Sequence, residues 1–434
     1  MTDPDEIRPV AIAIEAAEGS RLPDPAIREA LAQALARTGR TLRRVLLIPP
    51  DFTRFHSYAG TITAMLAEIL GERCRVDILP ALGTHVPVAP EESRAFFGAG
   101  IDPGSLLVHN WRDDVVKIGQ VPGDYVRSIS EGLMDGPVDV ELNRRILDPE
   151  YDLVISIGQV VPHEVVGMAN QSKNLFVGCG GASMISSSHM LGAFYGLERI
   201  MGRDHSPVRK LFDYAQDHFL HGVPLLYVLT VTTAKGPDIS VHGLYIGRGR
   251  DLFEKAVALS RKRNLIFVDK PLRTVVVNLD AQEFKSTWLG NKAVYRTRMA
   301  IADGGRLIVL APGVARFGED ARNDALIRKY GYVGRDRVLE LFRANADLQE
   351  NQSVPAHLIH GSSDGRFSVT YATRILTREE VEGVGFGWMP YDEAATRFDP
   401  ARLKDGFNTV DGEEIYYISN PALGLWAARE RFSD

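Results

Sequence analysis

Short apolar segments alternate with helical patterns along most of the chain, and this alternation limits the folds open to it. Residues 42–50 form an apolar run that ends in two prolines, and residues 57–73 then carry apolar side chains at helical spacing. The alternation continues with further strands expected at 75–83, 105–110 and 151–160, and with a helix expected at 89–100. Strands that are apolar throughout and separated by helices are typical of a parallel sheet covered on both faces. The sequence therefore predicts an α/β protein.

The length of the chain and a restart of this pattern predict two domains. A chain of 434 residues is too long for one ordinary hydrophobic core. After the helical pattern that ends at residue 264, strand, helix and strand patterns follow again, at 272–280, 290–302 and 305–313. We expect domains at 1–266 and 267–405, each with a largely parallel sheet flanked by helices. The last segment, 406–434, is expected to rejoin the first domain.

Composition and charge exclude several classes of protein. The formal net charge is −6 and the pI is near 6.0, which argues against a protein that binds the phosphate backbone of nucleic acids. No apolar run approaches the ~18–20 residues of a membrane span, and the acidic N-terminus has no signal-peptide core. Cys74 and Cys179 are too few for a disulfide framework. We expect a cytoplasmic enzyme that binds neither nucleic acid nor membranes.

Polar side chains follow three of the expected strands. Asp51, Thr53, Arg54 and His56 follow the first, Thr84 and His85 the second, and His163 the strand at 151–160. In open α/β sheets, ligands bind beyond the carboxyl ends of the strands, so these side chains are expected at one edge. A lone histidine after a strand is usually an ordinary loop residue. We give that interpretation to His56, His205, His218, His221, His357 and His360.

The segment 159–189 is polar but almost uncharged, and it contains His163, Lys173 and His189. A lysine without charged neighbours can be a buried nucleophile, and a pyridoxal Schiff base is one common result. The glycine-rich stretch 178–189 matches neither the dinucleotide-binding nor the phosphate-loop pattern. His189 follows three serines that are expected to cap a helix starting at residue 190, a rigid position for a metal ligand. One histidine cannot hold a divalent metal alone, so further ligands are needed.

Four motifs occur in order along the chain. They are Asp51-x-Thr53-Arg54; Gly83-Thr84-His85; His163 followed ten residues later by Lys173 and sixteen after that by His189; and Lys292 ahead of Gly304 and Gly305. With these motifs the chain resembles the nickel-pincer lactate racemases and their homologues along nearly its whole length.

The resemblance implies an unusual cofactor. In this family a lysine, here Lys173, carries a thioamide bond to the pyridinium-3,5-bisthiocarboxylic acid mononucleotide. Two sulfurs and one ring carbon of that nickel-pincer nucleotide hold nickel, and a histidine, here His189, supplies the fourth ligand in a square-planar site. The resemblance thus implies cofactor-synthesis and nickel-insertion proteins as partners. It also implies a set of residues that bind the cofactor, namely Asp51, Thr53, Asn170, Gln171, Ser172 and Lys173.

The resemblance also implies a reaction, the inversion of C2 in a 2-hydroxy acid. His85 and His163 would be the acid–base pair, each serving one face of the substrate, because histidine exchanges protons near neutral pH. Arg54 and Lys292 would bind the carboxylate and polarise the carbonyl that develops.

Departures from the family pattern bear on the substrate. Where the lactate enzymes have Ser-Gly-Gly-Ala, this chain has Ala-Asn-Gln-Ser at 169–172; Val86 replaces an arginine and Leu289 a glutamine. Added amides at Asn170, Gln171 and Asn291 favour a substrate with several hydroxyls. We expect an epimerase of an aldonic acid such as gluconate or mannonate. The alternatives are a racemase of lactate or another short 2-hydroxy acid, a cofactor-free protein that binds sugar acids, and a pyridoxal enzyme.

Overall fold

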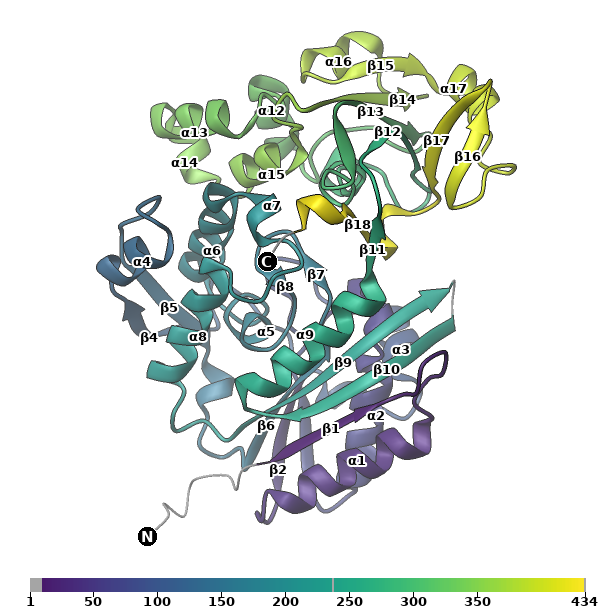
Figure 1. The fold of residues 1–434 in the computed structure, drawn as a ribbon. Coiled ribbons are helices and arrows are strands. Elements are labelled where there is room, and N and C mark those ends of the chain that lie inside the picture. The colour runs from purple at the N-terminus through teal and green to yellow at the C-terminus, as the bar shows by residue number, and fades with distance from the viewer. Residues whose placement is uncertain (1–9, 236–237, 433–434) are drawn as a thin grey trace. The chain divides into compact units, whose positions relative to one another are not determined.

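The structure, a computed structural model, describes residues 10–235 and 238–432, and in it the chain forms two compact units (Figure 1). The first unit comprises the residues through Leu191 together with Ile200–Asn264. The second comprises Gly192–Arg199 and the chain from Leu265 onward. Each unit contains a largely parallel sheet flanked by helices, so the predicted α/β class is confirmed.

The first unit is built around a six-stranded sheet in the order β1-β10-β9-β6-β2-β3. Its strands are β1 (Ala11–Glu15), β2 (Arg44–Ile48), β3 (Arg75–Ile78), β6 (Leu153–Gln159), β9 (Leu225–Lys235) and β10 (Asp238–Gly247). Its helices are α1 (Asp24–Arg37), α2 (Ala59–Leu70), α3 (Pro90–Phe97), α4 (Gly123–Ile129), α5 (Ser172–Phe176), α6 (Ala182–Tyr195), α8 (Pro207–Phe219) and α9 (Arg250–Asn264). Two small hairpins add β4 (Val115–Val121) with β5 (Val138–Asn143), and β7 (Pro162–His163) with β8 (Gly167–Met168).

The strand order of this sheet reverses at its centre. Strands β3, β2, β6 and β9 are parallel, whereas β10 and β1 are antiparallel additions at one edge. The chain leaves β2 toward β3 on one side and later enters β6 on the other side of β2. Loops that leave β2 and β6 therefore diverge at the carboxyl ends of these strands, which is where open α/β sheets bind ligands.

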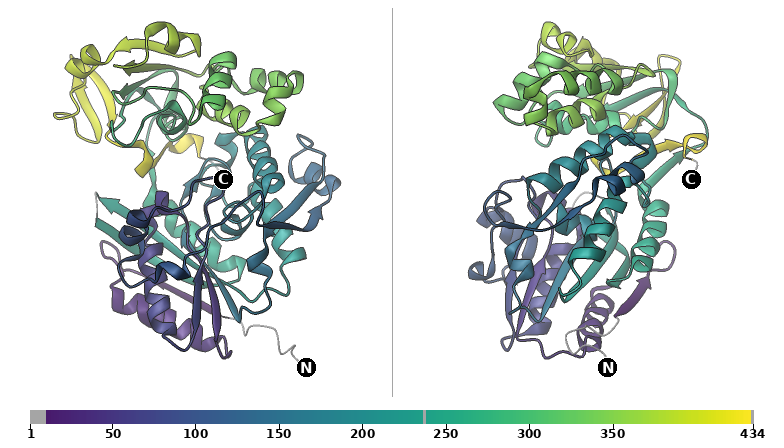
Figure 2. Two further views of the ribbon diagram at one scale, coloured as in Figure 1. Left: turned by 180° about the vertical axis from the view of Figure 1, so that it is seen from behind. Right: turned by 90° about the vertical axis from the view of Figure 1, so that its left-hand side faces the viewer.

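Both faces of the first sheet are buried, because the side chains of β2 alternate between two hydrophobic cores. Leu46 and Ile48 pack on the side of α5, α8 and α9. Val45 and Leu47 pack on the opposite side, against α1, α2 and α3. Helix α9 lies along β9 and β10 (Figures 1 and 2). The fully apolar run seen in the sequence therefore reflects burial from two sides.

The second unit has a six-stranded sheet in the order β15-β14-β13-β12-β17-β16, parallel except for β16. The strands of this sheet are β12 (Leu272–Asn278), β13 (Ile301–Ala311), β14 (Phe367–Thr373), β15 (Gly387–Pro390), β16 (Gly406–Val410) and β17 (Glu413–Ile418). A separate two-stranded sheet consists of β11 (Leu265–Val268) and β18 (Leu425–Ala428). Its helices are α7 (Leu197–Ile200), α10 (Thr287–Gly290), α11 (Lys292–Tyr295), α12 (Ala321–Tyr330), α13 (Arg335–Ala344), α14 (Ala346–Glu350), α15 (Ser353–Gly361), α16 (Arg378–Gly383) and α17 (Tyr391–Arg397).

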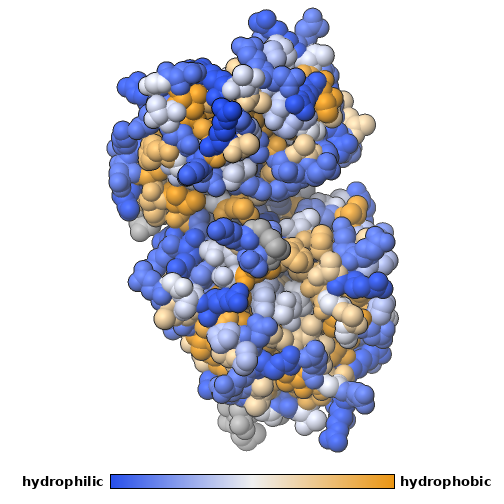
Figure 3. All heavy atoms as spheres, turned by 90° about the vertical axis from the view of Figure 1, so that its right-hand side faces the viewer, coloured by the Kyte–Doolittle hydropathy of each residue, from blue (hydrophilic) through white to orange (hydrophobic). Residues whose placement is uncertain are grey.

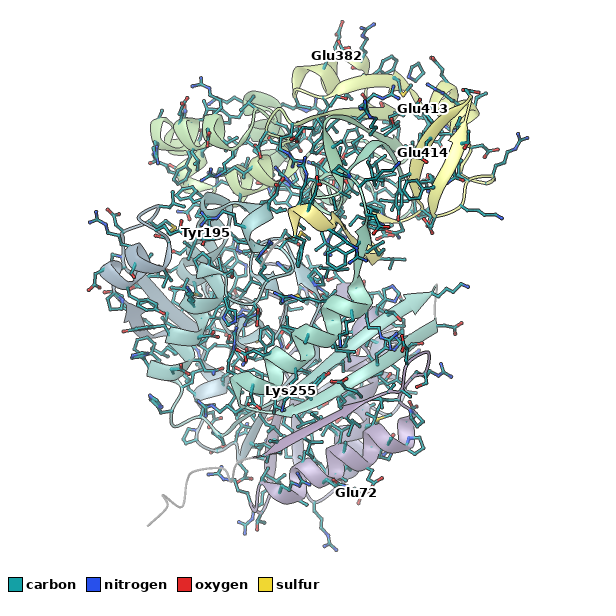
Figure 4. All side chains as sticks on the ribbon, viewed as in Figure 1. Glu72, Tyr195, Lys255, Glu382, Glu413 and Glu414 are labelled. Atoms are coloured by element: carbon teal, nitrogen blue, oxygen red, sulfur yellow. The ribbon has the colours of Figure 1, made fainter. Side chains whose placement is uncertain are left out.

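The C-terminal segment does not rejoin the first domain, so that prediction is wrong. Glu413 and Glu414 begin β17, which pairs with β12 inside the second sheet (Figure 4). Strand β18 pairs with β11, which is also in the second unit. Apolar residues of β17 are buried in the two hydrophobic cores of this sheet, Ile418 in one and Ile415 in the other.

Two further expected elements differ from the structure. At 105–110 only Leu106 bridges β3, through Ile78, and Val108 is 54% exposed, so this short run forms no strand. The helix expected at 290–302 is the four-residue helix α11, because β13 already begins at Ile301 and the chain must extend to reach it.

The surface of each unit mixes hydrophilic and hydrophobic side chains, as the face in Figure 3 illustrates. Exposed large apolar residues such as Val86 and Phe407 are spread over different elements, which is usual for globular proteins. Within residues 10–235 and 238–432, no helix combines the length and apolar character that a bilayer crossing requires.

Candidate active site

The site forms at the carboxyl ends of β2 and β6, where the strand order of the first sheet reverses. The side-chain amide of Asn174 donates to the Ile48 carbonyl (3.1 Å) at the end of β2 and to Ser156 Oγ (3.0 Å) in β6. This buried residue therefore ties α5 to both strands. Lys173, its neighbour in α5, is held near the carboxyl ends of these two strands as a result.

Asp51 and His85 form a hydrogen-bonded pair beyond the ends of β2 and β3. Asp51 Oδ1 accepts from the Thr53 amide (3.0 Å) and the Thr53 hydroxyl (2.5 Å), and its Oδ2 lies 2.5 Å from His85 Nδ1. Burial would raise the pKa of the Asp51 carboxyl, but hydrogen bonds from His85 and Thr53 hold this pKa below its usual value. The ionised carboxylate must accept, so Nδ1 of His85 carries a proton and neutral His85 keeps a lone pair at Nε2.

Asp51 and Thr53 therefore support His85 in this structure, because Asp51 accepts from Thr53 with one oxygen and from His85 with the other. Their predicted contact with a cofactor stays a prediction. The His85 side chain is 58% exposed, which leaves its Nε2 accessible.

Arg54 is an exposed cation at the same edge. It acts electrostatically on both Asp51 and Lys173, which places it in their neighbourhood. Over the ranges that the structure describes, its guanidinium makes no hydrogen bond or ion pair with a protein group. Arg54 can therefore receive an anionic ligand such as a carboxylate.

His163 follows β6 in a setting opposite to that of His85. It is 5% exposed, and the Val165 backbone N–H donates to its Nδ1 (3.1 Å). Nδ1 therefore holds a lone pair, and a neutral His163 carries its proton at Nε2. The carboxylate of Glu164 lies 3.9 Å from the same Nδ1, beyond hydrogen-bonding distance.

A strained turn presents Lys173. Asn170 and Gln171 both have positive φ, 71° and 54°, which non-glycine residues rarely adopt. The fully buried Arg209 of α8 holds this turn by donating to the carbonyls of Met168 (2.7 Å) and Asn170 (3.1 Å). Its guanidinium also donates to Ser172 Oγ (2.9 Å). The Ser172 hydroxyl thus points into the core, and its predicted contact with a cofactor is not supported.

The Lys173 amine is poised to react. Burial lowers its pKa to about 8, with added repulsion from Arg54 and Arg209, while Glu164 and Asp51 act in the opposite direction. In the described part of the chain, this amine has no hydrogen-bond or ion-pair partner. At pH 7 about a tenth of this amine is therefore neutral and nucleophilic, far more than of a lysine with the ordinary pKa.

His189 lies in the middle of α6, not at its start. The helix begins at Ala182 and ends at Tyr195, labelled in Figure 4, so the preceding serines lie within it and the predicted cap is wrong. His189 Nδ1 donates to the Ile185 carbonyl (2.6 Å), which leaves the Nε2 lone pair for a metal. Burial lowers the pKa of His189 and the charge of Lys173 lowers it further, so the imidazole is neutral as a ligand requires.

The glycine-rich stretch before α6 serves close packing. A Cβ at Gly180 would overlap the backbone of Phe176, and one at Gly181 would overlap Glu141. The Glu141 carboxylate accepts from the Ser183 N–H (2.9 Å) and so caps the helix that carries His189. The glycines thus bring β5 against α6, and no phosphate is needed to explain them.

Two other predicted residues lie in the second unit. Lys292 begins α11, with its amine 5.6 Å from the centre of the Phe284 ring. Asn291 is fully buried and accepts from the Tyr371 hydroxyl (2.8 Å), so it does not offer its carbonyl to a substrate. The predicted role of Lys292 in binding the carboxylate stays a prediction.

The sequence interpretation missed Glu164 and Arg209. Glu164 acts electrostatically on both Lys173 and His189, and its position beside His163 was the available signal. Arg209 had no local signal, because its partners lie 37–41 residues away in the chain.

Comparisons with known proteins show similarity to lactate racemases in sequence over residues 6–199 and in fold. Residues 6–199 match the family model of the lactate racemase N-terminal domain. A solved protein from Thermotoga maritima is 24% identical with a TM-score of 0.79, over 95% of this chain and 100% of that one. The lactate racemase apoprotein from Thermoanaerobacterium thermosaccharolyticum is 16% identical with a TM-score of 0.68, over 98% and 96%. The comparison with curated proteins gave no match.

The two solved structures share the fold of this chain over nearly its whole length. The family match covers the region that contains Asp51, His85, His163, Lys173 and His189. Residues 6–199 are thus similar to the lactate racemase N-terminal domain, and the chain as a whole shares the fold of the two solved structures.

Proposed function

We propose that the protein is a racemase or epimerase that inverts C2 of a 2-hydroxy acid with a lysine-tethered nickel-pincer nucleotide. The observation that carries this proposal is the buried, unpartnered amine of Lys173 where the strand order reverses, close enough to His189 to act electrostatically on it, with the Nε2 lone pair of His189 left for a metal. His85 and Arg54 lie at the same edge of the sheet and can engage the oxygens of a hydroxy acid. The similarity of residues 6–199 to the lactate racemase N-terminal domain supports the racemase or epimerase class.

The residues present fit such a cofactor. Gln171, next to Lys173, buries a side-chain oxygen, Oε1, that has no hydrogen-bond partner and could accept one from a bound molecule. Among the described residues, His, Cys, Asp and Glu side chains form no group of three metal ligands around His189; the one such group is Asp204, His205 and Glu254. A metal at His189 would need its remaining ligands from a bound group, as a pincer cofactor provides.

The chain's own residues would divide the work around the substrate. Lys173 would anchor the cofactor, which when bound supplies nickel and a site that accepts and returns a hydride. His189 would bind nickel through Nε2, oriented by its hydrogen bond to Ile185. Arg54 would bind the substrate carboxylate with its planar fork. His85, oriented by Asp51, would exchange the proton of the C2 hydroxyl.

An aldonic acid such as gluconate or mannonate is our proposed substrate. Its support is an exposed polar rim at the carboxyl edge of the first sheet, formed by Thr53, Arg54, His56, Thr84 and His85. Hydroxyl and imidazole groups of such a rim can bond several substrate hydroxyls, which a methyl-bearing acid lacks. A site built to bond hydroxyls rejects an analogue without them, because its polar groups are left unpaired.

A substrate panel tests the proposal. The protein, produced together with cofactor-synthesis and nickel-insertion proteins, is incubated with lactate, malate, 2-hydroxyglutarate, gluconate and mannonate, each deuterated at C2, and followed by NMR. We expect interconversion of the aldonate C2 epimers with the deuterium retained. Lactate racemisation with inert aldonates would instead assign a short-acid racemase. Binding of aldonates with no turnover of any acid, by protein that contains nickel, would contradict the proposed reaction.

A matched pair of variants tests the metal site. His189→Ala should lose nickel, measured by elemental analysis, while the covalent mass on Lys173 remains. His221→Ala is the control, because His221 is an exposed residue that follows none of the strands of the site and should not affect nickel content.

A further inference from the structure

We infer that Arg296, in the second unit, binds the carboxylate of a small organic acid. The inference goes beyond the proposed function and does not depend on it, because Lys173 and Arg54 belong to the first unit. It rests on a buried positive charge that the protein itself leaves without a counterion.

Three arginines are buried in the part of the chain that the structure describes, and they differ in their partners. Arg209 is fully buried, and both of its terminal nitrogens donate hydrogen bonds. Arg298 and Arg296 are 4% and 6% exposed. Over residues 10–235 and 238–432, the guanidinium of Arg296 makes no hydrogen bond and no ion pair, and its Nε is enclosed without a partner.

Arg298, only two residues further along the chain, shows how this protein stabilises a buried arginine. Its Nε donates to Glu198 (2.9 Å), its Nη1 to the Ser362 carbonyl (3.0 Å) and its Nη2 to Asp364 (2.6 Å). Two carboxylates therefore balance its charge, and all three nitrogens are bonded. Arg296 has the same degree of burial and none of this compensation.

The backbone holds Arg296 in place from both sides. Its N–H donates to the Lys292 carbonyl (3.0 Å), which closes the last turn of α11. Its carbonyl accepts from the Trp426 N–H (2.9 Å) of β18. The main chain at Arg296 is thus fixed between a helix and a strand, so a ligand would meet a guanidinium on a rigid support.

A buried guanidinium without a counterion is strongly destabilising, because arginine keeps its charge in proteins. An anion that binds the guanidinium would remove this cost. One uncompensated positive charge is balanced by one negative charge, which a carboxylate supplies, and the planar fork of arginine matches the two carboxylate oxygens. A phosphate dianion would leave an excess of buried negative charge. The small exposed fraction of Arg296 restricts the ligand to a small acid.

The first test compares the two arginines in apoprotein free of carboxylate buffers. Urea unfolding is followed by tryptophan fluorescence, because Trp288, Trp388 and Trp426, three of the four tryptophans, lie in the second unit. Arg298→Met should lower the urea midpoint, because two carboxylates lose their cation. Arg296→Met should leave the midpoint unchanged or raise it, because it removes an uncompensated charge. A similar decrease in both variants would overturn the inference.

The second test measures binding through stability, with sodium lactate as the carboxylate at about 50 mM. Sodium chloride and sodium phosphate at equal ionic strength are the comparisons, and Arg54→Met protein is used so that the exposed cation of the first unit does not contribute. Lactate should raise the urea midpoint relative to chloride. The increase should disappear when Arg296→Met is added, and Arg296→Lys should retain only part of it, because lysine has the charge without the fork.

A lactate effect that is the same with and without Arg296 would overturn the site. An Arg296-dependent effect of phosphate without one of lactate would overturn the carboxylate as its ligand. Both results are independent of turnover, so an Arg296-dependent effect in a protein that inverts no hydroxy acid would contradict the proposed function alone.

Discussion

Replacing Asp51 by asparagine should invert the tautomer of His85 and so remove the base. The asparagine side chain is isosteric with aspartate, and its carbonyl oxygen would remain bonded to the amide and hydroxyl of Thr53, as Asp51 Oδ1 is now. The NH₂ group of the new side chain would then face His85 Nδ1 and donate to it. The proton of His85 would move to Nε2, the position that must accept the substrate proton.

The size of the loss follows from the hydrogen bonds exchanged. To recover its active tautomer, His85 would have to give up a charge-assisted bond worth about 1.5–3 kcal/mol and face an unpaired donor at a further cost of about 1–3 kcal/mol. The sum, roughly 2.5–6 kcal/mol, corresponds to about 10²–10⁴ in rate. A wrong-tautomer substitution of this kind in a serine protease triad lies at the upper end of that range.

The assay is kcat on the loaded enzyme, with cofactor content measured by intact mass so that occupancy is controlled. Asp51→Ala is the matched control, because it removes the charge without presenting a donor to His85. We expect Asp51→Asn to be the slower of the two. Turnover of Asp51→Asn within a few-fold of the wild type, in folded and loaded protein, would refute the role given to this pair.

Three further predictions concern the support of the site. Because the pKa of Lys173 is lowered to about 8 from the ordinary 10.5, its amine is mostly protonated below pH 8 and mostly neutral above it. Labelling of Lys173 in the apoprotein with an amine reagent, mapped by mass spectrometry, should therefore rise with pH with a midpoint near 8. A midpoint equal to that of exposed lysines would contradict this prediction. In urea unfolding, Arg209→Met should lower the free energy of unfolding by about 3 kcal/mol, because two buried carbonyls lose their donor. Arg28→Met, at an exposed ion pair, is the control and should lower it by less than about 1 kcal/mol. Similar losses for the two variants would argue against the role of Arg209 in holding the turn. Gly180→Ala should destabilise by about 1–3 kcal/mol through overlap with Phe176, and Gly100→Ala, with open space around it, should be neutral; a stable Gly180→Ala protein would contradict the packing role of the glycines.

The sequence could predict which residues gather at the site, because strand ends are visible as apolar runs. Asp51 and Arg54 follow β2, His85 follows β3 and His163 follows β6, and parallel strands send these positions to one edge. The hydrogen bonds that each side chain makes at this edge depend on differences in position of a fraction of an ångström. Neither the pairing of Asp51 with His85 nor the opposite tautomers could be inferred from spacing.

Other parts of the site depend on residues far apart in the chain. Arg209 in α8 donates to the carbonyl of Asn170, which is 39 residues earlier in the chain, and no local sequence pattern indicates this contact. The place of His189 was misjudged because serines often cap helices, whereas here the packing of Gly180 and Gly181 starts the helix earlier. The C-terminal strand β17 was misassigned because an apolar strand fits any parallel sheet, and only the cores show which one it completes.

The most direct test of the central proposal is the intact mass of the protein made together with cofactor-synthesis and nickel-insertion proteins. We predict a covalent adduct on the wild type, mapped to the peptide that contains Lys173, and its complete absence from Lys173→Ala. Lys255→Ala, at an exposed position in α9, is the control and should keep the adduct (Figure 4). An adduct that survives in Lys173→Ala, or an active wild-type enzyme without any adduct, would contradict the proposed attachment.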